Sequence, residues 1–111
     1  MIKDSGSYES KLEGDALTVR IKGEIDHHNA VRIRQSIDAE IYQKRPKTVI
    51  FELSRVDFMD SSGLGLILGR FASVRDVGGE LIVKNPTRNV MKILRLAGAE
   101  RILKIVNDKI S

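Results

Sequence analysis

Two kinds of hydrophobic periodicity follow one another along this chain, and their alternation limits the possible folds more than any other feature. Residues 17–21 alternate between apolar and polar side chains, which is the period of a half-buried strand. Apolar residues then recur every three or four positions from Ala30 to Ile41, as on one face of a helix. The β-branched and aromatic stretch at 48–53 predicts another strand. A strand, a helix and a strand in this order predict a parallel crossover unit.

Turn and cap signals divide the rest of the chain. Gly14 and Asp15 predict a hairpin that joins a first strand at 7–13 to the strand at 17–21. Asp26 stands where a residue that caps the following helix is expected. A loop is predicted at 54–60, followed by a helix at 63–77. This helix is apolar around most of its circumference, so we expect it to be buried. The remaining predicted elements are a strand at 80–84, a helix that opens at Pro86 and ends at Gly98, and a strand at 102–106.

These elements give the order β-β-α-β-α-β-α-β. We expect an α/β fold with a mixed sheet, in which one antiparallel hairpin is followed by parallel crossovers. The first strands have a single apolar face, so part of the sheet should meet water on its other side, with the helices mainly on one face. The length of 111 residues predicts a single domain that spans 1–111.

Composition excludes several classes of protein. The chain has no cysteine, which excludes disulfide scaffolds, cysteine-ligated zinc and thiol catalysis. Apolar runs such as 66–68 are too short to cross a membrane, and residues 1–10 lack the apolar core of a secretory signal, so we expect a cytoplasmic protein with no membrane partner. The net charge is +4, but the basic residues are scattered among acidic ones, so we expect no nucleic-acid partner.

The segment from Asp60 to Gly65 carries more polar and glycine residues than a helix start requires. Asp60, Ser61 and Ser62 offer three capping side chains where one is enough, and no Glu or Gln follows at the distance that a capping box needs. Gly63 and Gly65 each cost about 1 kcal/mol of helix stability relative to alanine. Two explanations stay open: the glycines allow tight turning and close helix packing, or they leave the serines accessible to another protein.

No motif for catalysis or cofactor binding explains this segment. The glycine spacing misses the dinucleotide pattern by one residue, and neither a phosphate-binding Gly-Lys-Ser/Thr loop nor a hydrolase Gly-x-Ser-x-Gly elbow is present. Neither serine has a paired base, so we expect a protein that is not an enzyme and holds no cofactor. His27 and His28 would point about 100° apart on a helix, so no metal site is expected there. A small nucleotide- or anion-binding domain that uses the helix start at 61–65 is one alternative.

Two blocks of the sequence resemble the STAS family, and within it the anti-sigma factor antagonists. The block F-M-D-S-S-G-L-G at 58–65 is similar to the signature of that family, and G-E-I-D-H-H at 23–28 resembles a second segment of its sporulation antagonists. Shorter matches follow at 68–70 and 78–80. The resemblance covers about 14–106 with the same order and spacing, which makes it far more specific than a single glycine motif.

The resemblance implies a STAS-type fold and a regulator that switches partners. Ser61, the first serine of D-S-S-G, would be the phosphoacceptor, and Asp26, Asp60, Ser62 and Gly63 would belong to the surface that binds the partner. That partner would be an anti-sigma factor that is also a serine kinase and supplies the ATP, and a serine phosphatase would remove the phosphate. The unphosphorylated protein would bind the anti-sigma factor and release the sigma factor, and phosphorylation would switch this binding off. A STAS module of another stress-response system is the alternative within the family.

Overall fold

A five-stranded sheet in the order β1-β2-β3-β4-β5 forms the centre of the molecule. The structure is a computed structural model that describes residues 6–108. Its strands are β1 (Ser7–Glu13), β2 (Ala16–Ile25), β3 (Thr48–Met59), β4 (Glu80–Lys84) and β5 (Lys104–Val106), and its helices are α1 (His27–Lys44), α2 (Ser61–Asp76) and α3 (Arg88–Leu96), with a short 3₁₀ turn, η1, at Ala99–Arg101. The predicted order of strands and helices is confirmed.

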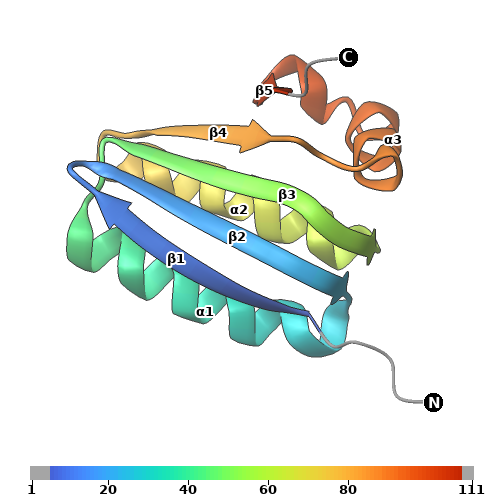
Figure 1. Cartoon of the computed structure of the whole chain (residues 1–111), viewed down its shortest axis with the longest axis horizontal. Helices are drawn as coiled ribbons and strands as arrows, with labels where there is room; N and C mark the ends of the chain where they lie inside the picture. Colours follow the sequence, from blue (N-terminus) through green and yellow to red (C-terminus); the bar gives the residue numbers. More distant parts are fainter. Residues whose placement is uncertain (1–5, 109–111) are drawn as a thin grey trace.

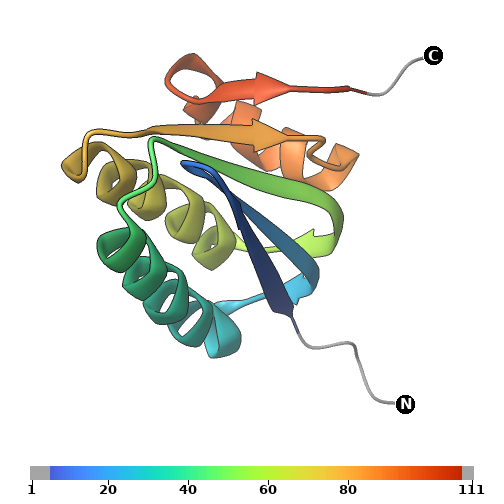
Figure 2. The same cartoon turned by 60° about the vertical axis from the view of Figure 1, so that its left-hand side comes forward.

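The helices lie mainly on one face of this sheet, as the sequence predicts. Strands β1 and β2 are antiparallel, and the pairs from β2 to β5 are all parallel. Each parallel crossover steps to the next strand in the same direction, and right-handed crossovers of that kind place their helices on the same side. Figures 1 and 2 show α1 and α2 together against one face, and α3 contacts both α2 and β3.

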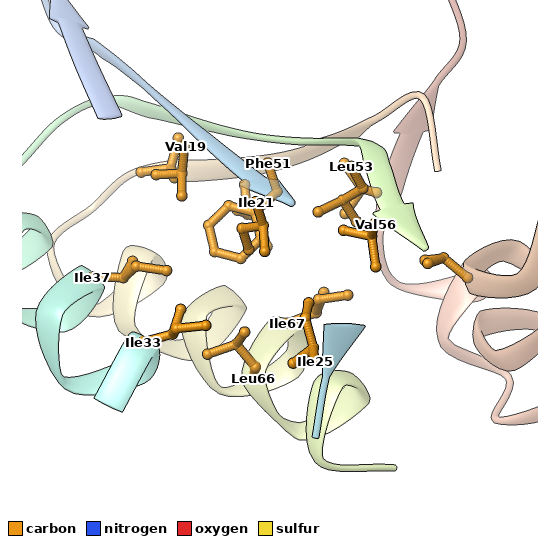
Figure 3. Packing of buried hydrophobic residues seen from close by; sticks show 14 of the residues in the cluster. Val19, Ile21, Ile25, Ile33, Ile37, Phe51, Leu53, Val56, Leu66 and Ile67 are labelled. Atoms are coloured by element: carbon orange, nitrogen blue, oxygen red, sulfur yellow. The ribbon is translucent and has the colours of Figure 1, made fainter. Parts of the chain in front are cut away.

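The hydrophobic core fills the layer between the sheet and the helices. Strand β2 contributes Leu17, Val19 and Ile21, and all three are at most 1% exposed. Figure 3 shows side chains of α1 and α2, among them Ile33 and Ile67, directed at this face of the sheet. On the other face the alternate positions of the strands, such as Glu9, Arg20 and Lys22, line open hollows. The expectation that one side of the sheet meets water is confirmed.

Strand β3 corrects the loop that was predicted at 54–60. The strand continues to Met59, and its pairing with β2 has two register shifts, each of which adds one residue to β3. The buried residues Leu53, Val56 and Met59 are therefore three positions apart, so the two-residue alternation typical of a strand is lost. Pairing with β2 keeps this segment extended although its local pattern resembles that of a loop.

Other boundaries differ from the predictions by a few residues. Helix α2 begins at Ser61 instead of residue 63, because Asp60 already caps it. Helix α3 begins after its cap Thr87 and not at Pro86, and β5 begins at Lys104 because η1 occupies part of the preceding stretch. Helix α2 is less buried than predicted, since its outer side carries the exposed Gly65 and other small residues. Within 6–108, no helix combines the length and hydrophobicity that crossing a bilayer requires.

Two polar contacts join α1 to α2 outside the hydrophobic core. Arg70 Nε lies 2.8 Å from Asp38 Oδ1, and the Arg70 side chain is only 7% exposed. Burial lowers the pKa of the Arg70 guanidinium, and the Asp38 carboxylate opposes this shift. Further along, the Tyr42 hydroxyl donates a hydrogen bond of 3.1 Å to Asp76 Oδ2. The two helices are thus fixed to each other as well as to the sheet.

Tyr8 of β1 gives a spectroscopic test of how β1 packs against α1. Its hydroxyl donates a 2.7 Å hydrogen bond to Glu40 Oε2, and burial together with the negative charge of Glu40 raises the Tyr8 pKa to about 12. In a Tyr42→Phe variant Tyr8 is the sole tyrosine, so its absorbance at alkaline pH should change with a midpoint near 12. Because the folded state favours the protonated hydroxyl, its contribution to stability should be complete below the unfolded pKa of about 10 and be lost as the pH rises to about 12. A midpoint near that of free tyrosine would contradict this packing.

Candidate functional site

The candidate site lies at the edge of the sheet where β2 and β3 both end. Ile25 and Met59 are register partners at the ends of these two parallel strands. The backbone N–H of Asp60 also donates to the carbonyl oxygen of Ile25, at 3.2 Å. Asp26 and Asp60, each the next residue of its strand, are therefore brought to the same edge. Figure 1 shows the first turns of α1 and α2 beginning there.

Ser61 is the most accessible polar group of the first turn of α2. Asp60 is the N-cap, and its Oδ1 accepts a 2.8 Å hydrogen bond from the backbone N–H of Ser62. Ser61 is the first helical residue and is exposed, whereas Ser62 is half-buried. In the part of the chain that the structure describes, the Ser61 hydroxyl has no hydrogen-bond partner. A modifying enzyme would therefore find this hydroxyl unobstructed.

The helix start favours negative charge at Ser61. The first turn of α2 holds no acidic residue after the N-cap Asp60, and the positive end of the helix dipole stabilises an anion placed there. The Asp60 side chain occupies the N–H of Ser62, and the Asp60 carbonyl oxygen accepts the N–H groups of Gly63 and Leu64, at 3.0 and 3.4 Å. A negative group on Ser61 would therefore lie at the favourable end of the helix dipole, directly after the Asp60 carboxylate in the chain.

Asp26 caps α1 in the same way that Asp60 caps α2, with a more complete set of bonds. Its carboxylate accepts the N–H groups of His28 and Asn29, at 2.9 and 3.2 Å, and the Asn29 side chain accepts the N–H of Asp26 at 3.1 Å. These bonds, that of Asn29 foremost, hold the pKa of Asp26 below its ordinary value. The predicted N-cap is confirmed, and the role of Asp26 in binding a partner stays a prediction.

The two glycines of the motif have different surroundings. Gly63 is buried, and a Cβ placed on it would lie 2.7 Å from Met59 Cβ, closer than two such atoms can approach. A Cβ on Gly65 would meet no atom within 4 Å apart from the backbone of its own helix. Close packing therefore explains Gly63, and its predicted contact with a partner stays a prediction. Nothing in the described fold explains Gly65.

Two residues of α1 that lie beside this site were not predicted from the sequence. Val31 and Arg34 line a groove between α1 and α2, and Ser62 and Gly65 line its other wall. Val31 is 48% exposed although it is apolar. The signal that could have found it is its position outside the buried helical stripe, since an apolar residue on the polar face of a helix has no role in the core.

The two histidines of α1 form no metal site with their neighbours. The rings of His27 and His28 lie with their centres 4.0 Å apart and tilted by 36°. His28 Nδ1 is 3.8 Å from the capping carboxylate of Asp26. Residues 6–108 contain no group of three or more His, Cys, Asp or Glu side chains arranged to hold a metal ion.

Comparisons with known proteins agree with this geometry. Residues 7–109 match the STAS domain family. The chain is 39% identical over 84 residues to an anti-sigma F factor antagonist of Lysinibacillus sphaericus, covering 76% of this chain and 72% of that protein. It is 35% identical over 95 residues to one of Paenibacillus polymyxa, covering 86% of this chain and 81% of the relative.

Solved structures give the same result. The structure of the anti-sigma factor antagonist SpoIIAA in its unphosphorylated form superposes with a TM-score of 0.81 at 32% identity, covering 93% of this chain and 89% of the other. The phosphorylated form of SpoIIAA from Bacillus superposes with a TM-score of 0.76 at 31% identity, covering 93% and 92%. The fold described above is therefore that of an antagonist whose structure is known in both states.

Paired alanine substitutions test the different roles of the two glycines. Gly63→Ala should lower the free energy of unfolding by about 1–3 kcal/mol, because the new methyl group overlaps Met59 Cβ, which the strand holds in place. Gly65→Ala should leave stability unchanged or raise it by up to about 1 kcal/mol, because alanine favours the helix and the space is open. Denaturant unfolding of both variants measures the difference. Equal stability of Gly63→Ala and the wild type would show that packing does not require this glycine.

Proposed function

The chain belongs to the STAS domain family, and from this premise we propose that it is an anti-sigma factor antagonist controlled by phosphorylation of Ser61. In its unphosphorylated form it binds an anti-sigma factor, which thereby releases its sigma factor. The anti-sigma factor is also the serine kinase and brings the ATP, and a serine phosphatase reverses the modification. The protein itself is a regulator in the cytoplasm and carries out no catalytic step.

One observation carries this proposal: an exposed serine with no hydrogen-bond partner within 6–108 opens a helix at the edge where two N-caps meet. The present chain carries the D-S-S-G block, and it aligns over most of its length with anti-sigma F factor antagonists. The similarity favours a partner of the sporulation type over one from another stress-response system. Asp26, Asp60 and Ser62 would surround Ser61 in the docking surface.

Phosphorylation would act on the partner and leave the fold unchanged. A phosphoserine carries about −1.5 to −2 charges and three acceptor oxygens near neutral pH. At Ser61 these would face outward from a helix start that stabilises negative charge internally. A partner that approaches Ser61 closely would meet both the bulk and the charge of the phosphate. Docking would then be lost although the antagonist stays folded.

Incubation with the cognate anti-sigma factor kinase and ATP should place one phosphate on Ser61. Ser61→Ala should abolish the incorporation, and Ser62→Ala, the matched control, should retain it because the neighbouring hydroxyl is half-buried. Mass spectrometry of tryptic peptides locates the phosphate. Modification of Ser62 alone would refute the assignment.

Ser61→Asp should imitate the switched-off state. We expect its affinity for the anti-sigma factor to fall about tenfold or more, which corresponds to about 1.4 kcal/mol. Its melting temperature should stay near that of the wild type, since a carboxylate at this helix start contributes a few tenths to about 1 kcal/mol favourably. Calorimetric titration and thermal unfolding on one preparation measure both. Loss of binding that accompanies a large loss of stability would indicate damage to the fold and count against the switch.

A further inference from the structure

The groove between α1 and α2 has properties that folding alone does not explain. Its α1 wall carries His27, Val31 and Arg34, and its α2 wall carries Ser62 and Gly65. Val31 is 48% exposed, so an apolar side chain lies open to water in the middle of the groove. The open position of Gly65 adds a stretch of bare backbone on the opposite wall. A hydrophobic side chain from another molecule would fit between them.

Arg34 gives this groove an uncompensated positive charge. Within 6–108 Arg34 makes no ion pair, and Asp38, one turn further along α1, contacts Arg70. The charge of Arg34 opposes that of Arg70 and contributes to the lowered pKa of the buried guanidinium. The exposed Arg34 guanidinium therefore remains available to a charged group from outside the chain. A carboxylate brought by a partner would give Arg34 the ion pair that it lacks within the described residues.

We propose that the α1–α2 groove receives a segment of the anti-sigma factor in which an apolar side chain stands beside an Asp or Glu. The apolar side chain would contact Val31 and the bare backbone at Gly65, and the carboxylate would pair with Arg34. This rests on the proposed function and specifies the chemistry of the partner. A nucleic acid fits the groove less well, because the groove offers one arginine beside an apolar residue instead of a basic cluster.

The position of the groove links it to Ser61. Ser62, the next residue, is part of the groove wall, so a segment bound there lies beside the phosphorylation site. A partner carboxylate held by Arg34 would experience the negative charge of a phosphate on Ser61. Repulsion between the two would release the acidic segment. The groove thus supplies a reason why a change of charge at Ser61 is an effective signal.

A set of matched variants tests the groove with the cognate anti-sigma factor as the probe. Arg34→Glu should weaken binding by the unphosphorylated chain about tenfold or more, and Val31→Ala about fivefold. Arg88→Glu makes the same change of charge on the exposed start of α3 and should alter the affinity by less than about twofold. The melting temperatures of all three should stay close to that of the wild type, because these side chains are exposed. Replacing the partner's acidic residue by arginine should restore binding to Arg34→Glu.

The outcomes separate this inference from the proposed function. If the wild-type chain binds the anti-sigma factor in a Ser61-dependent way while Arg34→Glu behaves like Arg88→Glu, the groove proposal fails and the function stands. If the wild type binds no anti-sigma factor, both fail. If Arg34→Glu instead abolishes binding to duplex DNA and leaves the anti-sigma affinity unchanged, the groove is a nucleic-acid site and the proposal is overturned.

Discussion

The pairing of β2 with β3 determines where the candidate site of this protein lies. These two strands run parallel and end level with each other, at Ile25 and Met59. A hydrogen bond from the Asp60 backbone to Ile25 extends the ladder one step past the end of β3. Both strands lead directly into helices, so the two capping aspartates and Ser61 follow from this one alignment. A slip of one residue would turn the buried side chains of β3 outward and displace α2 with them.

Much of this arrangement could be predicted from local sequence, and what could not has a physical explanation. Strand β4 was predicted with its observed bounds because its buried residues alternate regularly. The order of elements was predicted because most elements show the regular spacing of apolar residues that is typical of a strand or a helix. The second half of β3 was not, because two bulges space its buried residues three apart, and only pairing with β2 reveals it as a strand. The segment around Ser61 was singled out by its surplus of capping residues and glycines, and the role of Ser61 was implied by the resemblance to the STAS family. Val31 and Arg34 were missed because their role depends on the neighbouring helix, which a local pattern does not contain.

The glycines of α2 show that one residue type serves different needs within a single turn. Gly63 has no space for a methyl group because Met59 fills the position beneath it. Gly65 has space and still carries no side chain, although alanine would favour the helix. Gly63 lets the first turn of α2 pack closely on the end of β3, whereas Gly65 leaves the outer surface of the helix without a side chain. The sequence alone does not distinguish close packing from an open surface, because both explanations predict a glycine at each of these positions.

The polar contacts between α1 and α2 hold the two helices together without using the residues of the groove. Arg70 with Asp38, and Tyr42 with Asp76, hold the two helices as one body, and the inward side chains anchor that body to the sheet. The outward residues of the groove take no part in either set of contacts. Val31 and Arg34 lie on the same stripe of α1 as Asp38 and Tyr42, at spacings of three or four residues, so the groove and the helix–helix contacts follow one another along one side of α1. Because Val31 and Arg34 take part in neither contact, substitutions there can change the shape and charge of the groove while the helix pair keeps its contacts and its anchoring to the sheet.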